Sequence, residues 1–273
     1  MRPRGLVSML VAALTLPPAA AAPWMRSEGE AAWDATLTRA SGDHYWDRQG
    51  DYRPLDCRSR NLYLSQGLEY GYSYYHTLFA RADLASKRCG RDAASGPGDV
   101  ELGIRGRLDL YRNGRTWELS LTLPTGYSRT APSRLGYGRI GLEAGIYGLF
   151  KGSEADPVRS WDWEAGTSLR WWQGPPAEQW LGYLRWARRV KPLGKFTLGL
   201  DAELSFWNGT DEPTRFVNQS RQAEYDKLTA RAAFSRALGE EWGWRVALGD
   251  VLWGRNAGDD LSISFGIHRI WKP

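Results

Sequence analysis

Two runs of alternating apolar and polar residues, joined by an Asn-Gly pair, stand out in the middle of the chain. In residues 99–110 and again in residues 117–123, aliphatic or aromatic side chains alternate with charged or hydroxylated ones. A period of two predicts β-strands, because successive side chains of a strand point to opposite faces. Asn113-Gly114 between such runs is a strong hairpin signal. We therefore expect an antiparallel hairpin with one apolar and one ionic face.

The same alternation recurs on both sides of this hairpin. It predicts further strands, which lie at residues 31–38, 62–70, 78–84, 140–146, 161–171, 180–186, 196–206, 228–235, 242–248 and 261–267. Polar or Gly-rich segments separate them, and long loops are expected at 41–59, 87–98, 124–137 and 208–224. The pattern thus predicts an all-β fold of about twelve strands, each of about ten residues, connected up and down.

An amphipathic sheet can bury its apolar face in a core or turn that face toward lipid. A soluble β-sandwich or lipocalin-like barrel is the first possibility, but small filled barrels typically close at about eight strands. Trp and Tyr residues gather near the expected strand ends, as in the aromatic girdles of membrane barrels. These residues are Tyr70, Tyr72, Trp161, Trp171, Trp180, Trp186, Trp207, Trp242, Trp253 and Trp271. We therefore predict a closed antiparallel transmembrane β-barrel in the bacterial outer membrane, surrounded by its lipid.

Composition supports export. Of the 273 residues, 15 are Trp and 13 are Tyr against 7 Phe, an excess of amphipathic aromatics that suits a membrane boundary. Residues 1–22 combine Arg2 and Arg4 with a short apolar segment and an alanine run, and are interpreted as a signal peptide preceding a barrel of residues 23–273. No basic run or nucleic-acid motif is present, so nucleic acid is not an expected partner.

Export also bears on the two cysteines, Cys57 and Cys89, both of which fall in expected loops. Oxidising compartments favour disulfides, so a bond between the two is the preferred interpretation and a pair of free thiols is the alternative. Nothing nearby has the spacing of a metal site, and no metal or cofactor is expected.

The ionic face of the barrel is the candidate functional surface. By alternation it carries Glu101, Arg105, Arg107, Asp109, Glu118, Glu143, Asp162, Glu164, Arg170, Arg185, Asp201, Glu203, Lys227, Arg231 and Arg245. One interpretation is a polar conduit whose mixed charges guide a small solute. The other is an interior filled by paired charges that leave no open pore, since twelve strands lie between filled and channel-forming barrels.

Two other functions are considered. A barrel hydrolase would need a nucleophile beside a base, but His268 and Ser264 lie four residues apart on one strand, about 13 Å, which is too far for a hydrogen bond. We therefore predict no catalytic residues. A receptor would use its long loops, with Tyr52, Arg215, Phe216 and Arg221 as candidates.

Three short motifs resemble a known family. They are Gly-Asp-Val-Glu-Leu-Gly-Ile-Arg at 98–105, Leu-Thr-Leu-Pro-Thr-Gly at 121–126 and Leu-Gly-Tyr-Gly at 135–138. Together they are similar to the outer-membrane family named for the meta-pathway of phenol degradation, whose members are barrel proteins regarded as transporters. The resemblance is clearest over about residues 60–150. It implies a channel for small solutes and no catalytic residues.

Overall fold

In a computed structural model, the described residues are 25–108, 114–126, 135–151, 161–174, 178–190, 192–206 and 225–272. They form twelve strands: β1 (Ala31–Trp46), β2 (Tyr52–Ser73), β3 (His76–Cys89), β4 (Asp92–Arg107), β5 (Arg115–Leu123), β6 (Gly141–Lys151), β7 (Trp161–Trp172), β8 (Glu178–Val190), β9 (Gly194–Phe206), β10 (Asp226–Leu238), β11 (Trp242–Arg255) and β12 (Ala257–Trp271). The predicted signal peptide lies outside the described residues. None of the described residues belongs to a helix that is long and apolar enough to cross a membrane.

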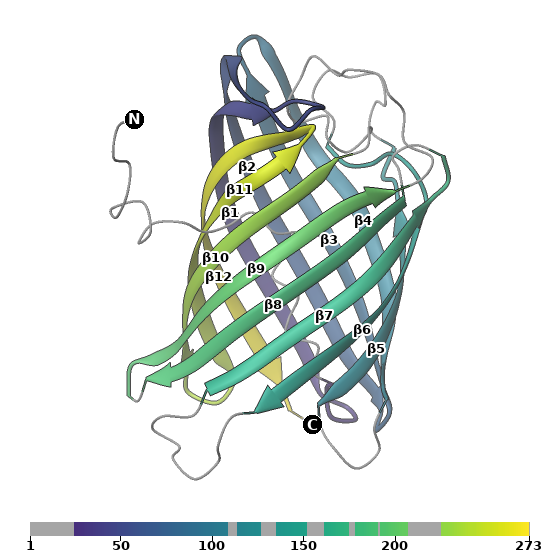
Figure 1. Cartoon of the computed structure of the whole chain (residues 1–273). Helices are drawn as coiled ribbons and strands as arrows, with labels where there is room; N and C mark the ends of the chain where they lie inside the picture. Colours follow the sequence, from purple (N-terminus) through teal and green to yellow (C-terminus); the bar gives the residue numbers. More distant parts are fainter. Residues whose placement is uncertain are drawn as a thin grey trace.

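The sheet closes on itself (Figure 1). Each strand pairs antiparallel with its neighbour in sequence, and β1 pairs with β12, so that Ala31 lies opposite Trp271. Closure leaves no open edge of unpaired backbone groups, which would each cost several kcal/mol in hydrocarbon. The predicted closed, antiparallel barrel of about twelve strands is therefore confirmed, and both described ends of the chain lie at the same end of it.

The apolar side chains face outward. On β9, Leu198, Leu200 and Leu204 are 43%, 45% and 40% exposed, whereas Asp201 between them is 7% exposed. The same inversion runs around the barrel, with aliphatic side chains on the outside and arginine, glutamate and threonine buried inside. An aqueous exterior would disfavour so large a continuous apolar surface, whereas hydrocarbon favours it. The structure is therefore that of a membrane-spanning barrel rather than a soluble one.

Aromatic side chains mark both ends of the apolar band. Tyr70, Tyr72, Trp242 and Trp271 are exposed near the end that carries the termini, and Trp171 is exposed near the other end, where β7 ends. This end, where β1 begins and β12 ends, is drawn at the bottom of Figure 1. The opposite end also carries Trp253, which is exposed, and Trp180, which is half-exposed. Trp186 lies lower on β8. Trp207 and the side chain of Trp161 lie outside what is described. The described aromatics therefore form the two belts expected at the water boundaries.

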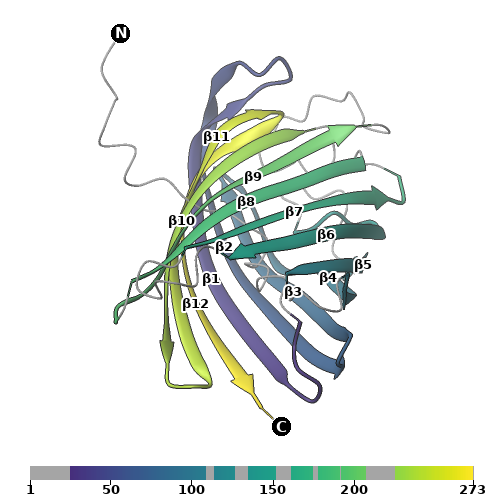
Figure 2. The same ribbon diagram turned by 60° about the horizontal axis from the view of Figure 1, so that its bottom comes forward.

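Two of the predicted long loops are instead strand. The segments 41–59 and 87–98 extend the β1–β2 and β3–β4 hairpins, leaving connections of only residues 47–51 and 90–91. These polar extensions lie beyond the apolar band, where both faces meet water and no alternation is required, so the sequence pattern there resembles a loop. In Figure 2 the extension of the β1–β2 hairpin rises above the rest of the rim.

The central hairpin also differs from its prediction. A two-residue turn at Asn113-Gly114 would place residue 112 opposite residue 115, but Arg107 pairs with Thr116. The register is therefore displaced by four residues and the connection between β4 and β5 is longer than a tight turn. Asn113 itself lies outside the described residues.

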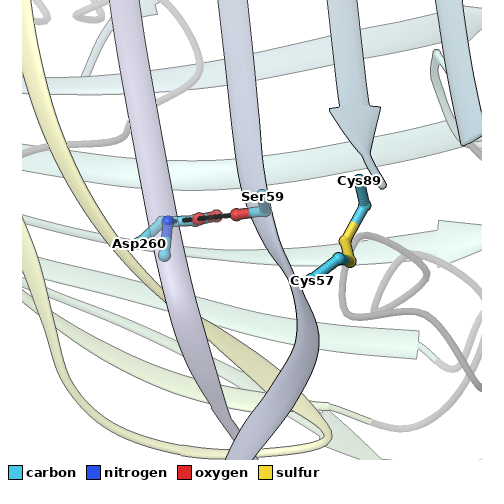
Figure 3. Close-up of a disulfide and its surroundings, with 5 residues drawn as sticks. Cys57, Ser59, Cys89 and Asp260 are labelled. Atoms are coloured by element: carbon cyan, nitrogen blue, oxygen red, sulfur yellow. Dashed lines mark hydrogen bonds between the residues drawn. A yellow bond between two sulfur atoms is a disulfide. The ribbon is translucent and has the colours of Figure 1, made fainter. Parts of the chain in front are cut away.

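The two cysteines form a disulfide bond, as the sequence analysis predicted. Cys57 lies within β2 and Cys89 is the last residue of β3, with their Cα atoms 5.5 Å apart, so neither is in a loop as predicted (Figure 3). On the neighbouring inward position Ser59 donates a hydrogen bond to Asp260 of β12 at 2.9 Å. Together these links fix the upper ends of β12, β1, β2 and β3 relative to one another.

Candidate functional site

The inner face of the barrel is lined by charged side chains that pair across strands. The largest group lies on β2 to β5 and is centred on Arg105, which is 1% exposed. Its guanidinium donates to Glu118 at 2.7 Å and to Glu69 at 3.2 Å. Arg81 of β3 bridges Glu101 at 3.3 Å and Glu118 at 3.5 Å. Charge-assisted bonds of this kind satisfy buried ions that would otherwise be costly.

The segment before β1 folds back onto this group. Ser27 lies so close over Gly71 that a side chain there would collide with its carbonyl oxygen. The backbone N–H of Arg26 donates to the Thr77 hydroxyl at 2.9 Å, and its guanidinium donates to Glu69 at 2.7 Å. We call residues 25–30 the N-terminal hook. It occupies space inside the barrel at the end that carries the termini.

A second group lies across β6 and β7. Arg170 binds Glu143 at 2.6 Å, and Ser168 donates to the same carboxylate at 2.6 Å. The Arg170 guanidinium also lies 5.7 Å from the centroid of the Trp172 ring. Tyr137, which precedes β6, packs on Trp172 with 4.0 Å between ring centroids. An aromatic surface thus adjoins a charged pair on the inner wall.

Tyrosines connect that group to β9 and β10. The hydroxyls of Tyr137 and Tyr225 lie 3.4 Å apart. Tyr225 donates to Glu203 at 2.6 Å, and Lys227 binds the other oxygen of Glu203 at 2.8 Å. Tyr137 precedes β6 and Tyr225 directly precedes β10. Their contact therefore crosses the interior of the barrel between these two strands and narrows it.

A third group spans β7 to β11. Arg185 binds Glu164 at 3.1 Å and Asp201 at 3.7 Å, and Arg231 binds the second oxygen of Asp201. Arg245 of β11 lies within electrostatic reach of Arg185, Glu164 and Asp201, but no ion pair joins it to an acidic side chain among the described residues. This part of the wall therefore carries one more basic than acidic group.

The remaining predicted residues lie apart from these groups. Arg107 stacks over the Tyr74 ring at 4.2 Å, near the end with the termini. Asp162 is half-buried and interacts electrostatically with Lys195. Asp109 lies outside the described residues, as do the receptor candidates Arg215, Phe216 and Arg221. Tyr52 is exposed on β2 and donates its hydroxyl to Asp259.

Several interior residues were missed by the sequence reasoning. Glu69 and Arg81 alternate with exposed neighbours on their strands, so the same period-two signal could have identified them. Arg26, Tyr137 and Tyr225 lie outside the strands. No periodicity marks such residues, and only the closed fold brings them to the interior.

The histidines do not form a catalytic arrangement in the described part of the chain. The His268 ring covers Gly243, and no described serine or threonine hydroxyl bonds to it. Ser73 lies 3.2 Å from the Nδ1 atom of His76, but the same hydroxyl accepts the backbone N–H of Tyr75 in a turn. No third group orients this pair, as a nucleophile and its base would require. His44 contacts Asp43 at the exposed rim.

Comparison with solved structures finds similar barrels among outer-membrane proteins. An outer membrane channel from Pseudomonas putida F1 matches with a TM-score of 0.74 and 15% identity, covering 94% of this chain and 100% of its own. The translocator domain of the autotransporter NalP from Neisseria meningitidis matches at 0.50 and 13%, covering 89% of each chain. The NanC porin matches at 0.50 and 8%, covering 86% of this chain and 98% of its own.

No protein-family model matches the sequence, and no curated protein matches it significantly. At these identities the structural likeness establishes the fold. These three structures are an outer membrane channel, a translocator domain and a porin. The chain therefore has the fold of a closed, antiparallel, outer-membrane-type β-barrel.

Proposed function

We propose that this protein is an outer-membrane channel that passes small solutes passively through its charged interior. The observation that carries the proposal is the inverted barrel: apolar side chains outside, paired ions inside. The charged residues predicted for the lumen are proposed to line this path. The finer proposal, membership of the family named for phenol degradation, is supported by the three motifs and by the similar channel from Pseudomonas putida F1.

The ion pairs indicate a narrow path. Arg105, Glu118, Glu164, Arg185 and Asp201 are each less than 9% exposed, so they lie against one another rather than in open water. The N-terminal hook takes up further space. Closely spaced charges of both signs suit a small polar or anionic solute better than a large one. Catalysis forms no part of the proposal.

A barrel without an open pore is the second candidate, and the same low exposure favours it. Paired charges across neighbouring strands would then serve to hold the wall rigid. The two candidates differ in one measurable property, because only a continuous aqueous path conducts ions.

Single-channel recording in planar bilayers therefore tests the proposal. We expect discrete steps from purified protein whose folding is shown by heat-dependent migration on gels. Glu203→Gln with Lys227→Gln removes an interior pair without changing net charge and is expected to alter conductance. Glu240→Gln with Lys272→Gln removes an exposed pair, 3.1 Å long, outside the lumen and is the matched control. A silent bilayer from folded protein would favour the rigid, closed barrel.

A further inference from the structure

Three arginines point outward at the upper edge of the apolar band, where β1, β2 and β3 leave it. Arg60 and Arg88 are directly opposite each other in the β2–β3 register. Arg60 also pairs with Ser41, two residues along β1 from Arg39. All three arginines are exposed. We call Arg39, Arg60 and Arg88 the outer arginine cluster.

The cluster sits at a boundary between apolar and polar wall. Below it on the same outward face, Leu37, Leu62 and Leu84 are 49%, 45% and 48% exposed, and on β3 the exposed Ser86 lies between Arg88 and Leu84. Arg39 lies beside Leu62 and Ile263 in the pairing of β1 with its neighbours. From Leu62 to Tyr72, β2 presents apolar or aromatic side chains at most outward positions. A tilted strand of about ten residues spans the hydrocarbon, so the cluster lies at headgroup level.

The lengths of the connections indicate that the end of the barrel with the cluster faces the outside of the cell. The start of β1, the end of β12 and short connections, such as residues 74–75 and 239–241, lie at the opposite end. The longer connections, 124–140 and 207–225, lie at the end of the cluster. Barrels of this type place short turns in the periplasm and long loops outside. The headgroups nearest the cluster therefore belong to the outer leaflet.

The three arginines of the cluster have no acidic partner among the residues that the structure describes. Opposed residues of neighbouring strands have Cβ atoms about 5 Å apart, and like charges so placed destabilise a sheet. No ion pair joins Arg39, Arg60 or Arg88 to an acidic side chain among the described residues. Two acids of this rim have other partners, because Asp43 contacts His44 and Asp259 accepts the Tyr52 hydroxyl. An external anion bound between the three arginines would offset this repulsion.

The surrounding structure fixes the spacing of the arginines. Arg88 immediately precedes Cys89, whose disulfide to Cys57 ties β3 to β2. Ser59, next to Arg60, accepts the backbone N–H of Gly42 at 3.0 Å and so ties β2 to β1. A preformed set of guanidiniums loses less entropy on binding a phosphate, whose oxygens match their planar geometry.

We propose that the outer arginine cluster binds the phosphate groups of a phosphorylated glycolipid of the outer leaflet. The apolar strip below it contacts the acyl chains of the same molecule. The site lies on the outside of the wall, so it is independent of whether the lumen conducts.

The probe is diphosphorylated lipid A in detergent, and dephosphorylated lipid A and inorganic phosphate are the comparisons. Two quantities are measured: the thermal midpoint of unfolding, and direct binding by native mass spectrometry. We expect lipid A to raise the midpoint of the wild-type protein. Arg39→Gln, Arg60→Gln and Arg88→Gln together should weaken binding at least about tenfold, since the triple variant loses all three charge-assisted contacts to phosphate. Arg115→Gln, Arg188→Gln and Arg236→Gln remove three exposed outward arginines at the other end and should leave binding unchanged.

The single variant Arg60→Gln guards against misfolding of the triple variant. Without lipid A its midpoint should equal or exceed that of wild type, because a like-charge pair is relieved. With lipid A it should gain less than wild type. Equal lipid A binding by the triple variant would overturn the proposal. An equal loss in the control triple, an equal effect of dephosphorylated lipid A, or full stabilisation by inorganic phosphate alone would also overturn it.

Discussion

The centre of the interior network can be tested by replacing Arg105 with methionine. Methionine keeps much of the length of the side chain but removes the bonds to Glu118 and Glu69, which measure 2.7 and 3.2 Å. Both carboxylates are less than 9% exposed and cannot be solvated in place. Breaking a buried ion pair by removing one partner costs about 3–5 kcal/mol.

The structure places the expected loss at the lower end of that range. Glu69 retains Arg26 at 2.7 Å, and Glu118 retains Arg81 at 3.5 Å, so neither carboxylate is left without a cation. We therefore expect Arg105→Met to lower the free energy of unfolding by about 3 kcal/mol. Arg105→Met with Glu118→Gln should lose less than the sum of the two single variants, since the two residues interact directly.

The assay is reversible denaturant unfolding in lipid vesicles, followed by tryptophan fluorescence. Arg269→Gln is the control, because it breaks a pair with Glu241 at 3.0 Å whose side chains are 35% and 49% exposed. Exposed pairs are worth at most about 1 kcal/mol. A loss of less than 1 kcal/mol in Arg105→Met, or additive losses in the double variant, would refute the interior ion-pair network as a stabilising unit.

Four further variants test other parts of the structure. Leu200→Arg, at a lipid-facing position that is 45% exposed, should cost about 2–4 kcal/mol in vesicle unfolding, whereas a soluble barrel would tolerate it. Replacing Cys57 and Cys89 by serine, or reducing them, should lower unfolding stability by about 2–4 kcal/mol without preventing insertion; unchanged stability would show that strand pairing alone holds the hairpins. Arg26→Gln should loosen the N-terminal hook and raise single-channel conductance; an unchanged conductance would show that the hook does not narrow the path. Arg245→Gln should lower the preference for anions over cations in reversal-potential measurements, and an unchanged ratio would contradict its placement beside the path.

The lipid-exposed wall is the part of the fold that the sequence specifies best. Leu198, Leu200 and Leu204 alternate with Asp201 and Glu203 because each position between the two boundaries faces either hydrocarbon or the interior. Where strands continue into water this requirement ends. The segment 41–59 is therefore strand in the structure but resembles a loop in sequence, and Cys57 was misplaced for the same reason.

The interior network depends on information that alternation does not contain. Arg185 lies opposite Gly199, so its bond to Asp201 runs diagonally across the β8–β9 pair. Such pairs require the register, and the register of the β4–β5 hairpin was predicted incorrectly. Tyr137 and Tyr225 meet only because the barrel closes. Sequence alone therefore predicts which strand residues face inward but not which of them bind one another.

Arginines on this barrel meet three different environments, and each satisfies the charge differently. Arg105 is enclosed by carboxylates of neighbouring strands, because nothing else in a closed interior can offset its charge. Arg269, at the exposed rim, is solvated and needs its partner little. Arg60 has neither a carboxylate partner among the described residues nor a position at the open rim, since it projects from the wall beside a second arginine at the edge of the hydrocarbon. In our proposal the phosphate groups of an outer-leaflet lipid offset the charge there, so that Arg60 would find in the membrane the partner that Arg105 finds inside the barrel.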